Sequence, residues 1–391
     1  MLGRFTKPFS RLTLGVLGAA LSLVGLMAQD HHGADHAADH HSAHGDAHAT
    51  EAHDAHGDAH GEFDAGSFII NHIADAHDIH LFADVHIPLP VILHIEGHGL
   101  EVFMSSAFEG HGHGDKHLTL DGGVHLTLHG EHPEEGHDPG TISASGPHGE
   151  TLAVFDASIT KSVFGLILVL IFMVLLFNAA ASSYKKRPGQ APKGLANAIE
   201  PLIIFLRDEV ARPSIGKEAD RFMPFLLTVF FFIFFSNLLG LIPFIGGFNI
   251  TGTVGVTLVL ATLVFLITNF SGNKHYWGHV LWMPGVPAAV KAIILTPIEV
   301  IGLFLKPTVL MIRLTANITA GHIIILAFTS LIFIFGKGGE APTAGFGIGI
   351  FSTAFMIFMY CLELLVAFLQ AYVFTLLAAI YFGDARQEAH H

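Results

Sequence analysis

The chain has 391 residues, of which 51% are hydrophobic and only 13% are charged. This composition and a mean hydropathy of +0.55 indicate a membrane protein. The formal net charge of −14 argues against nucleic-acid binding, which requires a basic face, and the single cysteine, Cys361, excludes an intrachain disulfide bond.

The first residues have the pattern of a secretory signal peptide, which we predict over 1–28. Three basic residues precede an apolar run over 12–27, and Ala28 stands before a change to polar sequence. Cleavage after Ala28 is one interpretation. An uncleaved anchor is the other, because Leu26 is a poor residue so close to the cut. In both cases the following sequence lies outside the cytoplasm.

Residues 29–65 are low-complexity sequence rich in His and Asp, with AHGDAH at 43–48 and again at 55–60. Because large apolar side chains are almost absent, this segment cannot bury a core, and we predict that it is disordered. One interpretation is binding of zinc, nickel or copper, which imidazole and carboxylate ligands suit. The other is a solvated tail. The absence of cysteine favours the tail, so no metal site is predicted.

Residues 66–157 are expected to form a small extracytoplasmic segment with some β-structure. Polar and apolar residues alternate over 117–128 on both sides of an Asp-Gly-Gly turn, which predicts a β-hairpin. The stretch 79–104 is interpreted as further strand, with a Pro-x-Pro interruption. Histidines in this segment are interpreted as exposed strand residues rather than metal ligands.

Five apolar stretches follow, each long enough to cross a bilayer. They are residues 162–182, 222–244, 250–270, 293–335 and 346–382. A basic cluster at 184–188 follows the first stretch and marks the cytoplasmic side. The N-terminus is therefore expected outside and the C-terminus in the cytoplasm.

The fold predicted from these stretches is an all-α polytopic membrane protein with about five membrane helices plus an interfacial helix. Residues 194–221 mix charged side chains with Leu, Ile and Phe, which suits a helix lying at the cytoplasmic surface. The last two stretches have ~40 residues, so they must tilt, break or lie partly along the surface. Pro297 and Pro307 predict breaks in the first of them, and the loop 336–345 makes the pair an antiparallel hairpin.

Within the fourth stretch an arginine stands at bilayer depth, where a charged side chain costs about 2.5–3.5 kcal/mol and is usually functional. Glu299, Lys306 and Arg313 are spaced by sevens and therefore share one helix face. His322 lies ~13 Å further along the axis and on the opposite side. One helix thus presents Arg313 to one neighbour and His322 to another.

The fifth stretch carries its own polar pair, Glu363 and Gln370, spaced by seven and on one face. If the hairpin closes at 336–345, His322 and Glu363 lie at similar depth. A histidine beside a glutamate in a membrane interior can relay protons, because each charge changes the pKa of the other group. A lone histidine would more simply be a helix-packing hydrogen bond, but the whole polar set favours the relay.

Three stretches, 221–244, 297–322 and 362–377, resemble subunit a of the F-type ATP synthase, the stator half of its proton channel. The resemblance covers about residues 160–383, so the predicted domains are 1–28, 29–65, 66–157, a membrane domain over 158–383 and a cytoplasmic tail over 384–391. It implies a non-catalytic subunit without a cofactor that offers two offset half-channels to the c-subunit ring. It also implies a b-subunit peripheral stalk, the remainder of the ATP synthase complex and the lipid bilayer as partners, in a bacterial inner membrane.

The resemblance also implies roles for individual residues. Arg313 matches the essential arginine of the family, and Asn317 and Gln370 match its polar partners. Glu299 matches a carboxylate on the cytoplasmic side of the path. No residue is expected to be catalytic.

Two departures from the family pattern concern the outer part of the path. His322 stands where some members have glutamate, and Glu363 stands where those members have histidine, so the pair is exchanged. Gly240 stands where some members have an aspartate. The His-rich extension is not a general feature of the family, and nothing carries over to it.

Two other classes of function fit the sequence less well. A divalent-metal transporter with a metal-collecting tail would place several His, Asp or Cys residues within the spans, yet the first three spans offer only Asn237 and Asn269. A membrane-embedded hydrolase would need a motif such as HExxH or GxSxG, and neither stands in a span.

Overall fold

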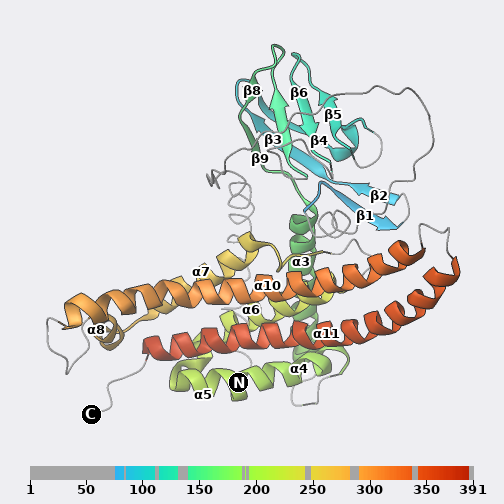
Figure 1. The fold of residues 1–391 in the computed structure, drawn as a ribbon. Helices are drawn as coiled ribbons and strands as arrows, with labels where there is room; N and C mark the ends of the chain where they lie inside the picture. The colour runs from blue at the N-terminus through green and yellow to red at the C-terminus, as the bar shows by residue number, and fades with distance from the viewer. Residues whose placement is uncertain are drawn as a thin grey trace, which may run out of the picture.

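The computed structural model describes residues 75–82, 85–110, 114–130, 140–186, 190, 193–242, 248–281, 290–336 and 342–386. The predicted signal peptide and His-rich segment lie outside these residues. Figure 1 shows a small β-domain above a group of long helices, joined to them at the start of α3.

The β-domain contains three antiparallel sheets with strand orders β1-β2, β4-β3-β9 and β5-β6-β7-β8. Its strands are β1 (Asp78–Phe82), β2 (Val85–Pro88), β3 (Pro90–Ile95), β4 (Gly99–Met104), β5 (Lys116–Thr119), β6 (His125–Leu128), β7 (Ile142–Ser145), β8 (Thr151–Leu152) and β9 (Val154–Asp156). The two larger sheets bury a shared core that includes Val91, Leu93, Ile95, Phe108 and Leu126. Alternating apolar residues on β3 supply much of this core.

The predicted hairpin is confirmed. Strands β5 and β6 pair with Leu118 opposite Leu126, and Gly122 and Gly123 adopt the positive φ angles of 97° and 82° that the turn requires. The stretch 79–104, in contrast, contains four strands with separate turns. Gly97 and Gly99 permit one of these turns, because both adopt a positive φ.

Not all histidines of this domain are exposed strand residues, so that prediction is wrong in part. His77 and His129 are only 5% and 6% exposed. Nε2 of His77 lies 3.1 Å from Asp156, and Nδ1 of His129 lies 3.3 Å from Asp115. The carboxylates make burial of these two imidazoles tolerable.

The predicted five spans are confirmed as helices long and apolar enough to cross a membrane. The helices are α3 (Lys161–Lys186), α4 (Leu195–Phe205), α5 (Arg212–Ile215), α6 (Ala219–Gly240), α7 (Val254–Ser271), α8 (Lys274–Leu281), α10 (Thr296–Gly336) and α11 (Pro342–Arg386), with π-helical turns at Leu206–Ala211 and Lys291–Leu295. Short helix α8 was not predicted.

The predicted interfacial helix 194–221 is divided rather than single. Helix α4 passes through a π-helical turn into α5, and Gly216 then ends α5 at a positive φ of 74° before α6 begins. Because only glycine adopts this conformation without strain, the sequence at Gly216 sets the boundary.

The predicted breaks in the fourth stretch are wrong, because α10 is continuous over 41 residues. Pro297 lies just after the π-helical turn Lys291–Leu295, and Pro307 is accommodated inside the helix. At 1.5 Å per residue α10 is about 60 Å long, twice the thickness of a hydrocarbon core, so it must tilt strongly. Figure 1 shows α10 and α11 side by side and steeply inclined to α3.

The membrane part packs around α6, whose Phe230 and Phe231 are fully buried. Small residues of α11, among them Ala371 and Ala378, let it approach this core closely. At the end of α11, Arg386 bonds to Glu218 and donates to the carbonyl of Ser271. This contact fixes one end of α11 against the beginning of α6 and the end of α7.

Candidate functional site

The structure brings His322 of α10 and Glu363 of α11 into contact. Nδ1 of His322 lies 3.0 Å from Oε1 of Glu363, and the two side chains are 15% and 7% exposed. Among the described residues, the second nitrogen of His322 and the second carboxyl oxygen of Glu363 are buried without a hydrogen-bond partner. Since unpaired buried polar atoms are rare, both atoms are available to a water molecule or a transferable proton.

A glycine makes this contact possible. A Cβ atom at Gly321 would lie 2.6 Å from Oε1 of Glu363, so a side chain there would displace the carboxylate. Sequence reasoning did not single out Gly321, because its importance depends on what α11 places against it.

The His322–Glu363 pair lines a small pocket, which we call the outer cavity. Its walls come from α6, the segment before α7, α10 and α11, and comprise Ser236, Asn237, Gly240, Leu241, Phe248, Thr251, Ile318, His322, Glu363 and Ala367. The hydroxyl of Thr251 donates to Asn237 over 2.5 Å, and the buried hydroxyl of Ser236 has no partner among the described residues. The cavity is therefore partly polar although it lies between apolar helices.

Gly240 closes one side of the outer cavity. A Cβ at this position would lie 2.7 Å from the carbonyl oxygen of Phe248 and 3.6 Å from Nε2 of His322. The backbone of the segment before α7 thus occupies the space that a side chain at 240 would need. A side chain at residue 240 would therefore require this segment to move.

Arg313 lies on the exposed face of α10. Within the described part of the chain it forms no salt bridge. Asn317 follows one turn later and is also exposed, whereas Leu310 and Leu314 are buried on the other side of the helix. The protein therefore presents Arg313 and Asn317 outward rather than to its own core.

The two remaining predicted site residues have different surroundings. Gln370 is 5% exposed on α11, and no hydrogen bond joins it to Arg313 among the described residues. Glu299 is half-buried near the beginning of α10. Burial raises the pKa of the Tyr276 hydroxyl, and the negative charges of Asp384 and Glu299 raise it further, which places Glu299 near α8.

A second small pocket, which we call the inner cavity, lies between α7, α8, α10 and α11. Its lining is Val264, Phe265, Thr268, Asn269, Tyr276, Leu303, Lys306, Pro307 and Tyr381. The ammonium of Lys306 lies 5.2 Å from the ring centroid of Tyr381. Along α10, Arg313 therefore stands between the residues of the inner cavity and those of the outer cavity.

Comparison with known proteins agrees with this architecture. The family described as ATP synthase A chain matches residues 163–383, which is more than half of the chain. The chain belongs to this ATP synthase A chain family. A family described as a domain of unknown function matches residues 68–154, which cover most of the β-domain.

Three relatives named ATP synthase subunit a are similar to more than half of this chain. ATP synthase subunit a 2 of Chlorobaculum tepidum is 47% identical over 252 residues, covering 62% of this chain and 68% of its own. ATP synthase subunit a of Chloroherpeton thalassium is 43% identical over 240 residues, covering 61% of this chain and 69% of its own. The protein of the same name from Myxococcus xanthus is 36% identical over 297 residues, covering 75% and 90%.

Family membership and the five apolar helices make the chain a multi-pass protein of the ATP synthase membrane sector, the part that conducts protons. Sequence reasoning proposed candidate site residues on α10 and α11, namely Glu299, Arg313, Asn317, His322, Glu363 and Gln370. It missed Ser236 and Thr251 of the outer cavity. The only signal for Ser236 was its place beside Asn237 in an otherwise apolar span.

Proposed function

We propose that this chain is the stator of a rotary proton channel and provides two offset half-channels separated by Arg313. The observation that carries the proposal is the position of Arg313 on α10, between the outer and inner cavities. Arginine stays protonated in proteins, so Arg313 cannot pass on a proton. It can attract a passing carboxylate of the c-subunit ring and block a direct leak between the cavities.

In this mechanism a proton enters the outer cavity from outside and reaches Nε2 of His322, the buried nitrogen that has no hydrogen-bond partner in the described part of the chain. The imidazole then gives up its Nδ1 proton to Oε1 of Glu363, 3.0 Å away. Glu363 passes a proton to a carboxylate on the ring. An imidazole suits this step because one ring nitrogen can accept a proton while the other donates one.

After travelling around the ring, the proton leaves through the inner cavity toward Glu299 and the cytoplasm. Asn317 shares the exposed face of Arg313 and would meet the ring with it. We place Gln370 beside this path as a polar group of α11. The orientation proposed is N-terminus outside and C-terminus in the cytoplasm of a bacterial inner membrane, with a b-subunit stalk holding the chain against rotation. The chemistry of ATP belongs to other subunits.

The test is Arg313→Ala in inverted membrane vesicles. We expect ATP-driven proton pumping and ATP synthesis to be abolished while the soluble ATPase activity persists. Arg221→Ala is a matched control, because Arg221 is also exposed and lies away from both cavities. Pumping by Arg313→Ala at the level of the control would overturn the proposal.

The alternative of a divalent-metal transporter rested on the His-rich segment, which lies outside the described residues. The family match over residues 163–383 favours the proton channel, and we propose that function alone.

A further inference from the structure

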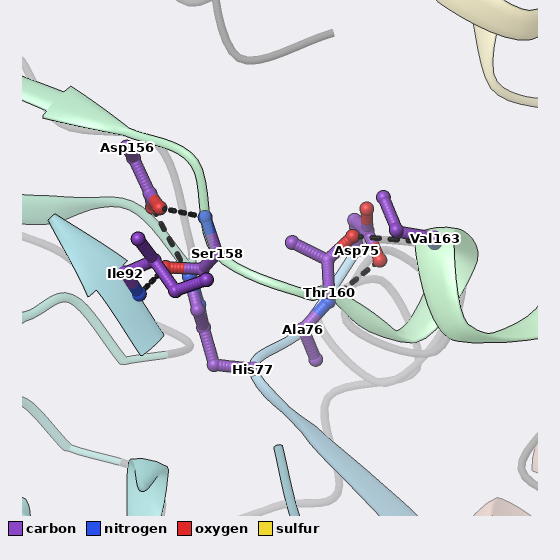
Figure 2. Close-up of polar contacts among 8 residues, drawn as sticks. All are labelled: Asp75, Ala76, His77, Ile92, Asp156, Ser158, Thr160 and Val163. Carbon is purple, nitrogen blue, oxygen red and sulfur yellow. Dashed lines mark hydrogen bonds and ion pairs between the residues drawn. The ribbon is translucent and has the colours of Figure 1, made fainter. Parts of the chain in front are cut away.

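The segment before β1 makes polar contacts with the start of the first membrane helix, α3, and Figure 2 shows Asp75 of this segment beside the start of that helix. Oδ1 of Asp75 accepts a hydrogen bond from the backbone N–H of Ser162 over 2.9 Å, and the carbonyl of Ala76 accepts one from the N–H of Lys161 over 2.8 Å. The first N–H groups of a helix have no partner within it. The segment before β1 thus caps α3, far away in sequence.

A second set of contacts holds this segment to the β-domain. Nε2 of the buried His77 lies 3.1 Å from Asp156 at the end of β9, and Asp156 also accepts from the N–H of Ser158 over 2.8 Å. The hydroxyl of Ser158 in turn accepts from the N–H of Ile92 over 3.0 Å. Figure 2 shows these residues as one connected group between the sheet and α3. The domain and the helix are therefore fixed to each other.

The capped end of α3 also supports the wall of the outer cavity. A Cβ at Gly165 would lie 2.8 Å from the ring of Phe248, so the helix and this ring are in direct contact. The hydroxyls of Ser162 and Thr253 are 3.5 Å apart. Phe248 and Thr251, in the same segment, line the cavity that contains His322. A continuous set of contacts thus joins the β-domain to the outer cavity.

We propose that Asp75 is a positioning residue through which the β-domain fixes the outer wall of the proton entry cavity. The proposal rests on the function proposed above, because it gives that cavity its role in proton entry. Without the cap, the first turn of α3 opens more often, and the segment 248–253 loses its support. Water and small reagents then reach the outer cavity more easily, and protons are delivered less well to His322.

The test uses a cysteine at Ser236, a near-isosteric change at a buried position in the outer cavity, with Cys361→Ser as background. The rate of its reaction with a small thiol reagent added from outside is measured in intact membranes. We expect Asp75→Ala to increase this rate about fivefold, the size of a lost helix cap. Asp75→Asn retains an oxygen that can accept from Ser162 and should stay within about twofold of the parent. A cysteine at Thr268, in the inner cavity, should not respond.

Gly165→Ala provides a second variant that leaves the β-domain unchanged. It should displace Phe248 and increase reactivity at Ser236→Cys as well. If Gly165→Ala increases the rate and Asp75→Ala does not, or if Asp75→Asn changes it as much as Asp75→Ala, the positioning role is overturned. If the Asp75→Ala protein does not accumulate in membranes, the other two variants still test the role. Asp75→Asn should be labelled at nearly the parent rate and Gly165→Ala faster. Equal labelling rates in these two variants would refute the support of the cavity wall by α3.

The labelling rate does not depend on proton pumping. A change in the Ser236→Cys rate together with normal pumping by Arg313→Ala would therefore refute the proton channel and leave the positioning role in place. An unchanged labelling rate in Asp75→Ala, together with abolished pumping by Arg313→Ala, would refute the positioning role alone. Proton pumping measured over a range of external pH adds the functional readout. We expect pumping to be reduced in Asp75→Ala and restored in Asp75→Asn.

Discussion

Gly321 lies directly against Glu363, so closely that a methyl group at residue 321 would overlap the carboxylate. The two residues come from different helices, and the clearance between them decides whether the carboxylate reaches His322 on the next residue of α10. Because proton transfer requires hydrogen-bond distance, a small displacement here should have a large effect.

We expect Gly321→Ala to reduce ATP-driven proton pumping by about tenfold or more, because it moves Glu363 away from His322. Gly302→Ala is the matched control on the same helix, since a Cβ at Gly302 would meet nothing within 4 Å. Pumping in inverted vesicles is the measurement. Equal pumping by the two variants would show that the carboxylate is not needed at its observed position.

The exchanged pair His322 and Glu363 permits a test of mutual dependence. Either single change, His322→Glu or Glu363→His, places two like groups together in a buried site, which disfavours both charged forms. The double change restores one imidazole and one carboxylate, so we expect more pumping from it than from either single variant. Equal loss in all three would argue that the two residues act separately.

The stability of the β-domain should depend on pH through Asp156. Burial by itself would raise the pKa of this carboxyl, but the hydrogen bonds from His77 and Ser158 outweigh it and lower the pKa below its usual value. A lowered pKa in the folded state stabilises the domain above the unfolded value of about 3.9. This stabilisation is lost as the pH falls through the folded pKa.

The measurement is hydrogen exchange of β3 and β9 peptides in the whole protein, corrected for the intrinsic rate, between pH 6 and pH values below about 4. Protection should fall with pH in the parent protein. Asp156→Asn keeps an acceptor for Ser158 but has no charge to titrate, so its protection should change less. A parallel fall in both proteins would assign the pH dependence to other groups, of which Asp115 is one, because its pKa is also lowered.

Features that depend on one short segment were predictable from the amino-acid sequence. The length of the apolar stretches identified the spans, the alternation around Gly122 and Gly123 identified the β5-β6 hairpin, and helical spacing placed Arg313 and His322 on different faces of α10. These succeed because length, periodicity and turn residues act within one element.

The tertiary structure alone decided the features that depend on distant segments. The capping of α3 by Asp75, the clearance at Gly321 and the outer cavity around Ser236 all arise where separate elements meet. The continuity of α10 through Pro307 is another such feature. A proline inside a helix usually breaks or kinks it, but α10 packs along α11 and stays helical. A pattern within one segment does not specify which surface lies opposite it, and that surface determines whether a glycine, serine or aspartate serves the site.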